Sequence, residues 1–338
     1  MNPGSGRGNM RIVTRPDFDG VVCAVLLYEV ENITRPIKWV EPNEMQKGLV
    51  EVLDGDIIAN LPHHRNCSLW FDHHFTNRPD GEFRGAYKIA PSAAGVIFEY
   101  YAGKFKNDYT GLVKQADKID SADLTEDEVV HPENYPYVLL SMTIVGRESY
   151  DEEYWNLLVD LFRKQATDID EILKHPVVRK KCDDVVVQNE RYKDLLKKYT
   201  RLEGHVAITD FRPLKTAPPG NRFLAYSLFP ESSANVKIRY DNRDPKKLIV
   251  SVGHSIFNRS CKVNVGDMLS KFEGGGHEKA GACAFDAGKA DEYIPGIISI
   301  LKKTGDKAVS LKRKPVSSDG RVCASQIPLY GRGKGRYS

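Results

Sequence analysis

Leu69-Trp70-Phe71-Asp72-His73-His74 joins an apolar run to three side chains that can bind a metal ion. The run from Ser68 to Phe71 has the length and β-rich composition of a buried strand. In an open parallel sheet, ligands bind beyond the carboxyl ends of the strands. We therefore expect these three polar side chains at the ligand-binding edge of an α/β sheet.

An acidic pair near the start of the chain also follows the carboxyl end of a predicted strand. Residues 12 to 14 are predicted to be a short buried strand, Asp17 and Asp19 follow it, and residues 20 to 30 are predicted to be an apolar helix. Further short strands are predicted at residues 38 to 40, 56 to 60 and 68 to 71. This alternation predicts a doubly wound, mainly parallel sheet with helices on both faces.

The chain changes character after residue 175. Residues 93 to 101 and 154 to 162 are predicted to be helices of the first domain, and a charged helical segment follows. Strands then dominate, at residues 206 to 208, 223 to 226, 234 to 240 and 247 to 252, before a last helix near residues 294 to 302. We predict a flexible N-terminus (1–10), an α/β domain (11–175), a helical linker (176–204), a smaller α+β domain across a cleft (205–302) and a basic, flexible tail (303–338).

Length and composition are typical of a soluble protein. The 338 residues, 41% of them hydrophobic, can bury a large core and favour two domains. No apolar stretch approaches the roughly 20 residues that a membrane-spanning helix needs, and the polar start lacks the apolar core of a signal peptide. We therefore expect a cytoplasmic protein without a membrane partner. The six cysteines form no Cys-x-x-Cys pair, which indicates reduced thiols.

Positive charge is concentrated at the C-terminus. The net charge is +3, but residues 303 to 338 carry nine Lys and Arg against two Asp, so the other 302 residues sum to −4. The tail could hold a polyanion through salt-sensitive attraction, or it could simply be a solvated segment. Because the rest of the chain is not basic, we expect no duplex DNA partner.

The acidic clusters have the chemistry of a divalent-metal site. Carboxylates and imidazoles without a thiolate favour Mn²⁺ or Mg²⁺ over a structural zinc ion. Mn²⁺ is the expected ion, with Mg²⁺ or Co²⁺ as alternatives. Two ions about 3.5 to 4 Å apart can activate a water for attack on phosphorus. The ordinary alternatives are an Asp-x-Asp-Gly turn that caps backbone amides and a partly exposed Asp-His-His loop.

A glycine-rich segment is a candidate phosphate-binding loop. Gly274, Gly275 and Gly276 let backbone amides approach an anion closely, and His277 adds a donor. The Ala-rich stretch after them is predicted to begin a helix, whose N-terminus would favour negative charge. The alternative is a flexible turn without a ligand.

These motifs, in this order, resemble the DHH phosphoesterase superfamily with its DHH-associated C-terminal domain, over about residues 11 to 300. The resemblance implies a DHH catalytic domain with two Mn²⁺ ions and a second domain that grips the substrate, as in oligoribonuclease- and exopolyphosphatase-like members. The matching positions are Asp17 and Asp19 for the first motif, Asp56 for the second, Asp72-His73-His74 for the third and Gly274 to His277 for the last.

The resemblance also implies a role for each metal ligand. Asp17 would bind one ion, Asp19 the other, and Asp56 would bridge them. Asp72 and His73 would complete the metal-binding set. One more ligand is expected from the stretch 117–123, either Asp120 or Asp117.

Catalytic and substrate-binding roles follow from the same resemblance. Asp56, His74 and Arg15 are the expected catalytic residues, with His74 facing the substrate phosphate or joining the ligands of the metal. Arg259 is expected to bind substrate together with Gly274, Gly275, Gly276 and His277.

The chain departs from the family just before the first Asp. Relatives place a metal-binding His two or four residues upstream, where this chain has Arg15 and Val13. Neither side chain can bind a cation, because the guanidinium stays protonated and valine has no donor atom. Arg15 could contact a substrate phosphate with two hydrogen bonds, or its charge could leave the site with one ion or none.

The expected function is a Mn²⁺-dependent phosphohydrolase. It would cleave a phosphoester or phosphoanhydride of a small nucleotide, a short single-stranded oligonucleotide or polyphosphate through a metal-activated water. The sequence leaves open whether the chain forms a homodimer. Because the upstream His is missing, a degenerate protein that binds nucleotide or polyphosphate without hydrolysis is the alternative. A nucleic-acid-associated protein dominated by its basic tail is a third interpretation.

Overall fold

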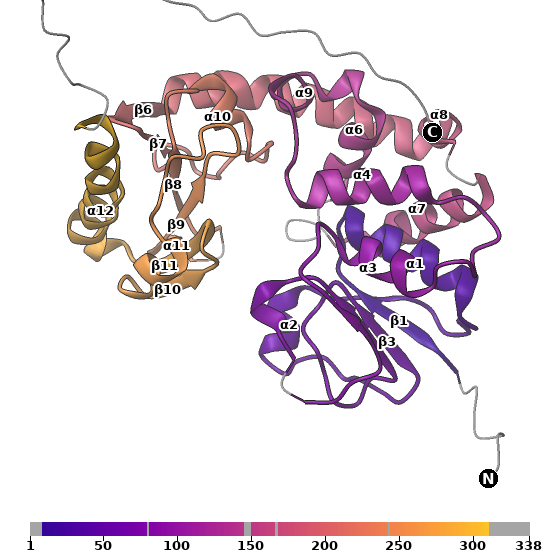
Figure 1. Cartoon of the computed structure of the whole chain (residues 1–338). Coiled ribbons are helices and arrows are strands. Elements are labelled where there is room, and N and C mark those ends of the chain that lie inside the picture. The colour runs from indigo at the N-terminus through magenta and orange to yellow at the C-terminus, as the bar shows by residue number, and fades with distance from the viewer. Residues whose placement is uncertain (1–8, 80, 145–149, 166–167, 243, 311–338) are drawn as a thin grey trace, which may run out of the picture.

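The structure, a computed structural model, describes residues 9–79, 81–144, 150–165, 168–242 and 244–310. Most of the predicted N-terminal segment and of the predicted tail therefore lies outside the described residues. The described chain forms two domains, each built on its own sheet (Figure 1). Helix α9 (Pro176–Tyr199) contacts elements of both domains, and it confirms the long helix predicted between them.

The first sheet has five parallel strands in the order β2-β1-β3-β4-β5. All four strands that the sequence predicts here are present within one residue at each end, and β5 is an addition. The α/β fold class is thus confirmed. The strands are β1 (Arg11–Thr14), β2 (Lys38–Trp39), β3 (Asp56–Ala59), β4 (Leu69–Asp72) and β5 (Gly85–Tyr87).

Both faces of this sheet are buried, which explains the continuous apolar runs. Ile57 of β3 and Phe71 of β4 pack into the core on one face, while their neighbours Ile58 and Trp70 pack into a separate core on the other. Successive side chains of a strand point to opposite faces, so a strand covered on both sides has no position for an exposed polar residue.

The two faces are covered differently. Helix α1 (Phe18–Val30) lies in the middle of one face, where it contacts α3 (Ala93–Tyr100), α4 (Thr110–Asp120) and α7 (Glu152–Gln165). The other core contains Met45 of the short helix α2 (Pro42–Gln46), together with residues of loops. The predicted helices on both faces are therefore present, but one face has a single short helix. The remaining helices of this domain are α5 (Glu126–Val130), α6 (Pro136–Met142) and α8 (Ile169–Lys174).

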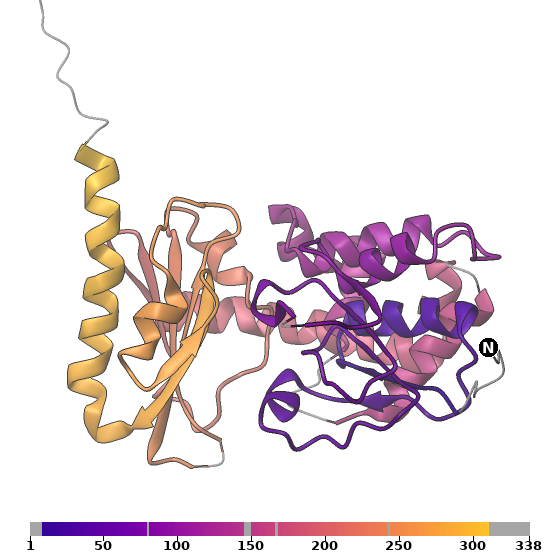
Figure 2. The same ribbon diagram turned by 60° about the horizontal axis from the view of Figure 1, so that its bottom comes forward.

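The second domain contains a mixed sheet of six strands in the order β10-β11-β9-β8-β7-β6. Strands β7 and β8 are parallel, and the other neighbours are antiparallel. Helices α11 (Val265–Ser270) and α12 (Ala290–Ser310) share its apolar core, and Figure 2 shows α12 on the side away from the first domain. The strands are β6 (Thr200–Glu203), β7 (Val206–Asp210), β8 (Ala234–Tyr240), β9 (Lys247–His254), β10 (Gly274–Gly276) and β11 (Ala280–Asp286).

Three predictions for the second domain were wrong in detail. Residues 223 to 226, predicted as a strand, belong mostly to helix α10 (Leu224–Leu228), because Leu224 packs against Tyr192 and Leu196 of α9. The Ala-rich stretch after the glycines is strand β11 rather than a helix. Helix α12 continues to residue 310, so the predicted tail does not begin at residue 303.

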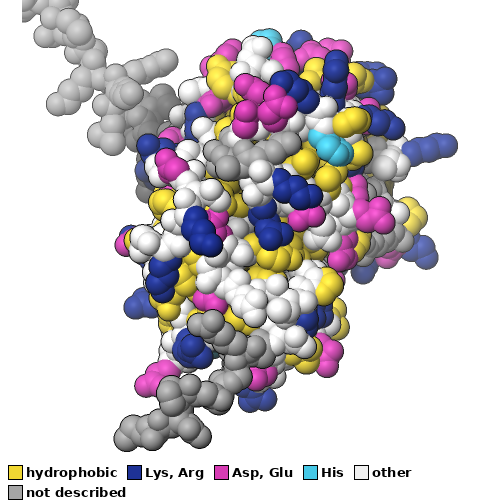
Figure 3. Space-filling model, turned by 90° about the vertical axis from the view of Figure 1, so that its right-hand side faces the viewer, with side chains coloured by type: hydrophobic (Ala, Val, Ile, Leu, Met, Phe, Trp, Pro, Cys, Tyr) yellow, Lys and Arg dark blue, Asp and Glu magenta, His cyan; other side chains and the backbone are white. Residues whose placement is uncertain are grey.

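Charges of both signs are mixed on the outer face of the first domain. Figure 3 shows this face, where Lys and Arg are interspersed with Asp and Glu. The described residues of this face therefore do not gather charge of one sign. Of the helices described, none is both apolar enough and long enough to cross a bilayer.

Asp56 lies at the amino end of β3, opposite the edge at which the sequence places the ligand site. Its carboxylate is fully buried and accepts hydrogen bonds from Arg11 at 2.9 and 2.6 Å, from Arg35 at 3.0 Å and from the amide of Leu53 at 2.9 Å. Arg11 and Asp56 face each other in the register of β1 and β3. This ion-pair network holds neighbouring strands together, so we assign Asp56 a structural role.

Replacing Asp56 should therefore affect stability more than metal binding. Asp56→Asn leaves two guanidinium groups short of a partner, and we expect the free energy of unfolding to fall by about 3 kcal/mol, as when one partner of a buried ion pair is removed. Urea denaturation measures this change. The exposed neighbour Asp54 is the control, since Asp54→Asn should change stability by less than about 0.5 kcal/mol. Unchanged stability with lost Mn²⁺ binding would contradict the structural role.

Candidate active site

Polar side chains converge where three parallel strands end. Asp17 and Asp19 follow β1, Asn60 follows β3, and Asp72-His73-His74 ends β4 and continues beyond it. Asp120, the last residue of α4, meets this edge from the helical layer. The strand order places β1, β3 and β4 side by side, so residues far apart in sequence become neighbours.

Asp19, His73 and Asp120 form the centre of the cluster. His73 Nε2 lies 3.2 Å from Asp120 Oδ2 and 3.9 Å from Asp19 Oδ2. The other ring nitrogen, Nδ1, donates to the carbonyl oxygen of Ala90 at 2.9 Å, which leaves the lone pair of the neutral ring on Nε2. Nε2 is buried and has no hydrogen-bond partner among the described residues. A cation between these three groups would satisfy that lone pair.

Helix α3 fixes the position of Asp19. The carboxylate accepts the backbone amides of Ala93 and Ala94, both at 2.9 Å, in the first turn of α3. Ser92 caps the same helix by accepting the amide of Gly95. Asp19 is only 2% exposed, so its orientation is set by the fold before any ligand binds.

Burial and the charges of neighbouring carboxylates raise the pKa of both carboxyl groups at the centre. Burial, and then the charge of Asp17, raise the pKa of Asp19 to about 7. Burial and the charges of Asp19 and Asp17 raise the pKa of Asp120 to about 7 as well. Two largely buried carboxylates without a paired Lys or Arg among the described residues attract a cation to the space between them. The residues present therefore fit a divalent metal ion.

Asp72 and His74 form a second pair beside this centre. Asp72 is fully buried, with Oδ1 at 2.8 Å from Nδ1 of His74, and its Oδ2 accepts the side-chain amide of Asn77 at 2.7 Å. Burial lowers the pKa of His74, but the hydrogen bond and charge of Asp72 outweigh burial and raise it above the usual value. His74 therefore carries its positive charge over a wider range of pH than a free imidazole.

Both carboxylate oxygens of Asp17 are bonded to other residues of the chain. Its Oδ1 accepts the amide of Gly20 at 2.8 Å and the side-chain amide of Asn60 at 3.0 Å, and its Oδ2 pairs with Arg15 at 3.1 Å. Asn60 is buried and adopts a left-handed backbone conformation with φ of 57°. The sequence predictions omit Asn60, although it follows the carboxyl end of β3, and Asp17 and Asp72 also lie at or just beyond the carboxyl ends of their strands.

The structure separates the remaining predicted metal ligands from the cluster. Asp56 lies at the opposite end of β3, which corrects its predicted role as a bridging ligand. Asp117 accepts the hydroxyl of Ser92 at 2.6 Å, so Asp120 and not Asp117 reaches His73. Val13 is buried in the apolar core on the face of the sheet that α2 covers, and it takes no part in the site.

His277 of the second domain lies within electrostatic range of two site residues of the first domain. Burial and the positive charges of His74 and Arg15 lower its pKa. A tight hairpin positions it, because its amide donates to the carbonyl of Ala280 at 2.7 Å. Gly276 has a φ of 149°, and a Cβ there would lie 2.4 Å from the Ala280 oxygen, so this turn requires glycine.

The other predicted substrate-binding residues are less closely tied to the cluster. Gly274 and Gly275 belong to β10 and pair with β11, so they form a strand rather than a loop before a helix. Arg259 is exposed in the loop after β9, where its Nε donates to the carbonyl of Ile256 at 3.1 Å. Their roles in binding substrate stay predictions.

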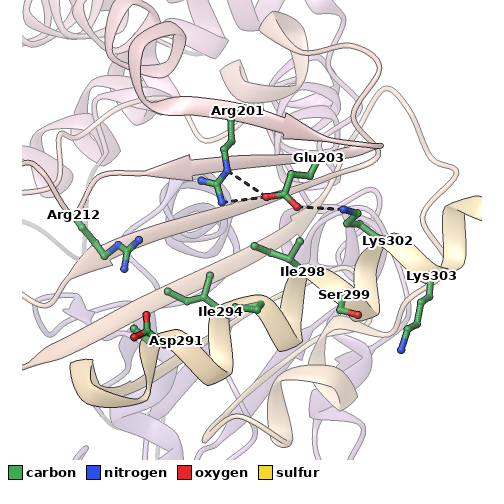
Figure 4. Close-up of a pocket in the computed structure, with 11 residues that line it drawn as sticks. Arg201, Glu203, Arg212, Asp291, Ile294, Ile298, Ser299, Lys302 and Lys303 are labelled. Carbon is green, nitrogen blue, oxygen red and sulfur yellow. Dashed lines mark hydrogen bonds and ion pairs between the residues drawn. The ribbon is translucent and has the colours of Figure 1, made fainter.

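A groove of about 440 Å³ between β6, β7 and α12 is separate from this cluster. Figure 4 shows Ile294 and Ile298 between its charged side chains. Arg201 and Lys302 both pair with Glu203. The groove thus has an apolar floor and largely compensated charges, and none of the acidic cluster residues lines it.

Comparison with known proteins relates the chain to phosphoesterases. No family model and no curated protein sequence matches it. A solved structure described as a pGpG-specific phosphodiesterase, PggH from Vibrio cholerae, is 32% identical, with a TM-score of 0.75 over 88% of this chain and 100% of that one. RecJ in complex with Mn²⁺ from Thermus thermophilus is 12% identical, with a TM-score of 0.54 over 87% of this chain and 52% of that one.

An exonuclease RecJ bound to manganese has the same fold. It is 11% identical, with a TM-score of 0.51 over 87% of this chain and 90% of that one. The identity to the Vibrio protein extends over the full length of that protein, and it includes both domains of this chain. With its motifs in the family order and its acidic cluster at the sheet edge, the chain belongs to the DHH phosphoesterase superfamily and is a phosphoesterase.

Proposed function

We propose that this protein is a divalent-metal-dependent phosphodiesterase that hydrolyses a short linear nucleotide, with the dinucleotide pGpG as the first candidate. The observation that carries the proposal is the buried cluster of Asp19, His73 and Asp120, whose imidazole nitrogen has no hydrogen-bond partner among the described residues. The substrate class is supported by 32% identity to a protein named a pGpG-specific phosphodiesterase.

Asp19, His73 and Asp120 would hold the metal ion. Mn²⁺ is the expected ion, with Mg²⁺ and Co²⁺ as alternatives, and the manganese complexes of proteins with this fold support that choice. When bound, such an ion lowers the pKa of a water ligand and neutralises charge on a phosphate oxygen. The hydrogen bond from His73 Nδ1 to Ala90 would keep the imidazole in the tautomer that can bind a cation.

Two cationic groups of the first domain and an imidazole of the second would bind the phosphate. Arg15 and His74 come from the first domain and His277 from the second, and their charges are close enough to depress the pKa of His277. His74, whose Nδ1 is bonded to Asp72, has its other ring nitrogen left to donate a proton to the leaving oxygen.

A binding protein without catalysis is the second candidate. Two observations favour it: Arg15 stands where relatives have a metal-binding His, and Asp17 is already bonded to Arg15 and Asn60. Such a protein would bind the same nucleotide with no metal-stimulated release of product.

A substrate panel separates the two candidates. The full chain would be incubated with pGpG, a cyclic dinucleotide, a trinucleotide, 3′-phosphoadenosine 5′-phosphate and polyphosphate, with Mn²⁺ or with a chelator. We expect release of GMP from pGpG with Mn²⁺, because the cluster and the cationic groups suit a single short substrate. Chromatography of the products measures it. Binding of pGpG without turnover would favour the second candidate, and turnover undiminished by the chelator would exclude metal dependence.

The choice between the two acids of α4 gives a sharper test of the site. Asp120→Asn removes a carboxylate 3.2 Å from His73 Nε2, and kcat should fall by at least about 100-fold. Asp117→Asn is the matched control on the same helix, and its kcat should stay within about threefold, because Asp117 bonds to Ser92 instead. Equal losses in both variants, each folded by circular dichroism, would show that the cluster is wrongly assigned.

A further inference from the structure

The two acids of the Asp-x-Asp pair have opposite surroundings. Both carboxylate oxygens of Asp17 are bonded by the protein, one by the amides of Gly20 and Asn60 and the other by the cation of Arg15. Asp19 accepts only neutral backbone amides and a weakly donating thiol, and the nearest oxygen of its carboxylate lies 3.9 Å from His73 Nε2. Among the described residues, Arg15 thus forms an ion pair with Asp17, whereas it acts on Asp19 and Asp120 only through longer-range attraction.

Arg15 is a permanent cation in this position. A guanidinium has no lone pair to offer a metal and does not lose its proton in proteins. The charge of Asp17 raises the pKa of Arg15 further, and Asp17 is about as enclosed as Arg15, with 23% and 27% of their side chains exposed. A divalent ion at Asp17 would have to displace this guanidinium or accept its repulsion.

Asn60 adds no negative charge beside Asp17. It follows β3 at the site edge, within hydrogen-bond distance of Asp17. Its neutral amide donates to Asp17 at 3.0 Å, which makes a third bond to that side chain from the protein. Its Oδ1 is buried without a hydrogen-bond partner among the described residues.

Asp19, His73 and Asp120 keep the features of an open cation site. His73 is 9% exposed, and its Nε2 has no hydrogen-bond partner in the part of the chain that the structure describes. The ion pairs found there for Asp19 and Asp120 involve only His73. No Lys or Arg among the described residues pairs with either acid.

We propose that the active site takes one divalent ion per chain, at Asp19, His73 and Asp120, and that Arg15 supplies the second positive charge from the protein itself. Asn60 is then a positioning residue that keeps Asp17 bonded to Arg15. The proposal rests on the metal dependence proposed above, but it concerns the number of ions. It also gives Arg15 a use in the reaction, since a guanidinium bonded to Asp17 through one nitrogen keeps other N–H groups for a phosphate.

The number of bound Mn²⁺ ions tests the proposal without reference to activity. Mn²⁺ added to the full chain can be followed by loss of the six-line electron paramagnetic resonance signal of the free ion. We expect one tightly bound ion per chain in the wild type. In the double variant Arg15→His/Asn60→Asp, which removes the cation and adds two ligands, we expect two ions and a low-temperature spectrum broadened by coupling between them.

Arg201→His is the matched control. It makes the same exchange on an exposed arginine of the second domain, and it should still bind one ion. If the double variant does not fold, Arg15→Gln replaces it, because loss of the charge alone should tighten binding of a second ion by about tenfold or more. Arg15→Lys keeps the charge and should still bind one ion.

Each other outcome overturns a definite part of the proposal. Two tightly bound ions in the wild type would show that Arg15 does not exclude the second ion, even if hydrolysis of pGpG is metal-dependent. If the wild type and the folded variants all bind one ion, Arg15 and Asn60 are not the reason why a second ion is excluded. No bound ion, together with hydrolysis that survives chelation, would instead contradict the proposed function itself.

Discussion

The proposed site depends most on the carboxyl groups of Asp19 and Asp120, which the fold buries at one edge of the first sheet. Asp19 and Asp120 are held near His73 by the first turn of α3 and the last turn of α4. Burial, and then the charges of neighbouring carboxylates, raise the pKa of both carboxyl groups to about 7. Burying such charges costs stability unless something balances them. The apolar strands and the helix layer around α1 make the edge rigid, so the site would be formed before its ligand arrives.

The second domain contributes the imidazole of His277, whose neutral form is favoured by burial and by the positive charges of His74 and Arg15. A glycine hairpin holds His277, and the apolar core under the six-stranded sheet supports the hairpin. The first domain thus supplies negative charge for a cation and the positive charges of Arg15 and His74 for a phosphate, and the second domain adds the His277 imidazole. This division suits the phosphoester chemistry of the superfamily to which the chain belongs.

The sequence predicts the strands of the first sheet closely because both faces of that sheet are buried, and burial leaves continuous apolar runs. It predicts Asp19, His73 and Asp72 because each follows such a run. It misplaces Asp56, because the family resemblance made a ligand of an acid that begins a predicted strand, whereas the carboxyl end of a parallel strand meets the site. The register with Arg11 confirms that Asp56 lies at the amino end. Asn60 is missed because a neutral amide gives no signal of metal chemistry.

Other details depend on packing that the sequence does not reveal. The choice between Asp117 and Asp120 depends on how α4 is rotated about its own axis. Residues 223 to 226 form a helix because they pack against α9, although their own propensity favours a strand.

The most direct test is a crystal structure of the protein soaked in Mn²⁺, with data collected at a wavelength where manganese scatters anomalously. The anomalous difference map should show a peak within bonding distance of Asp19, of His73 Nε2 and of Asp120. A map with no peak among these three residues, or with manganese bound at Asp56 instead, would contradict the assignment of the site.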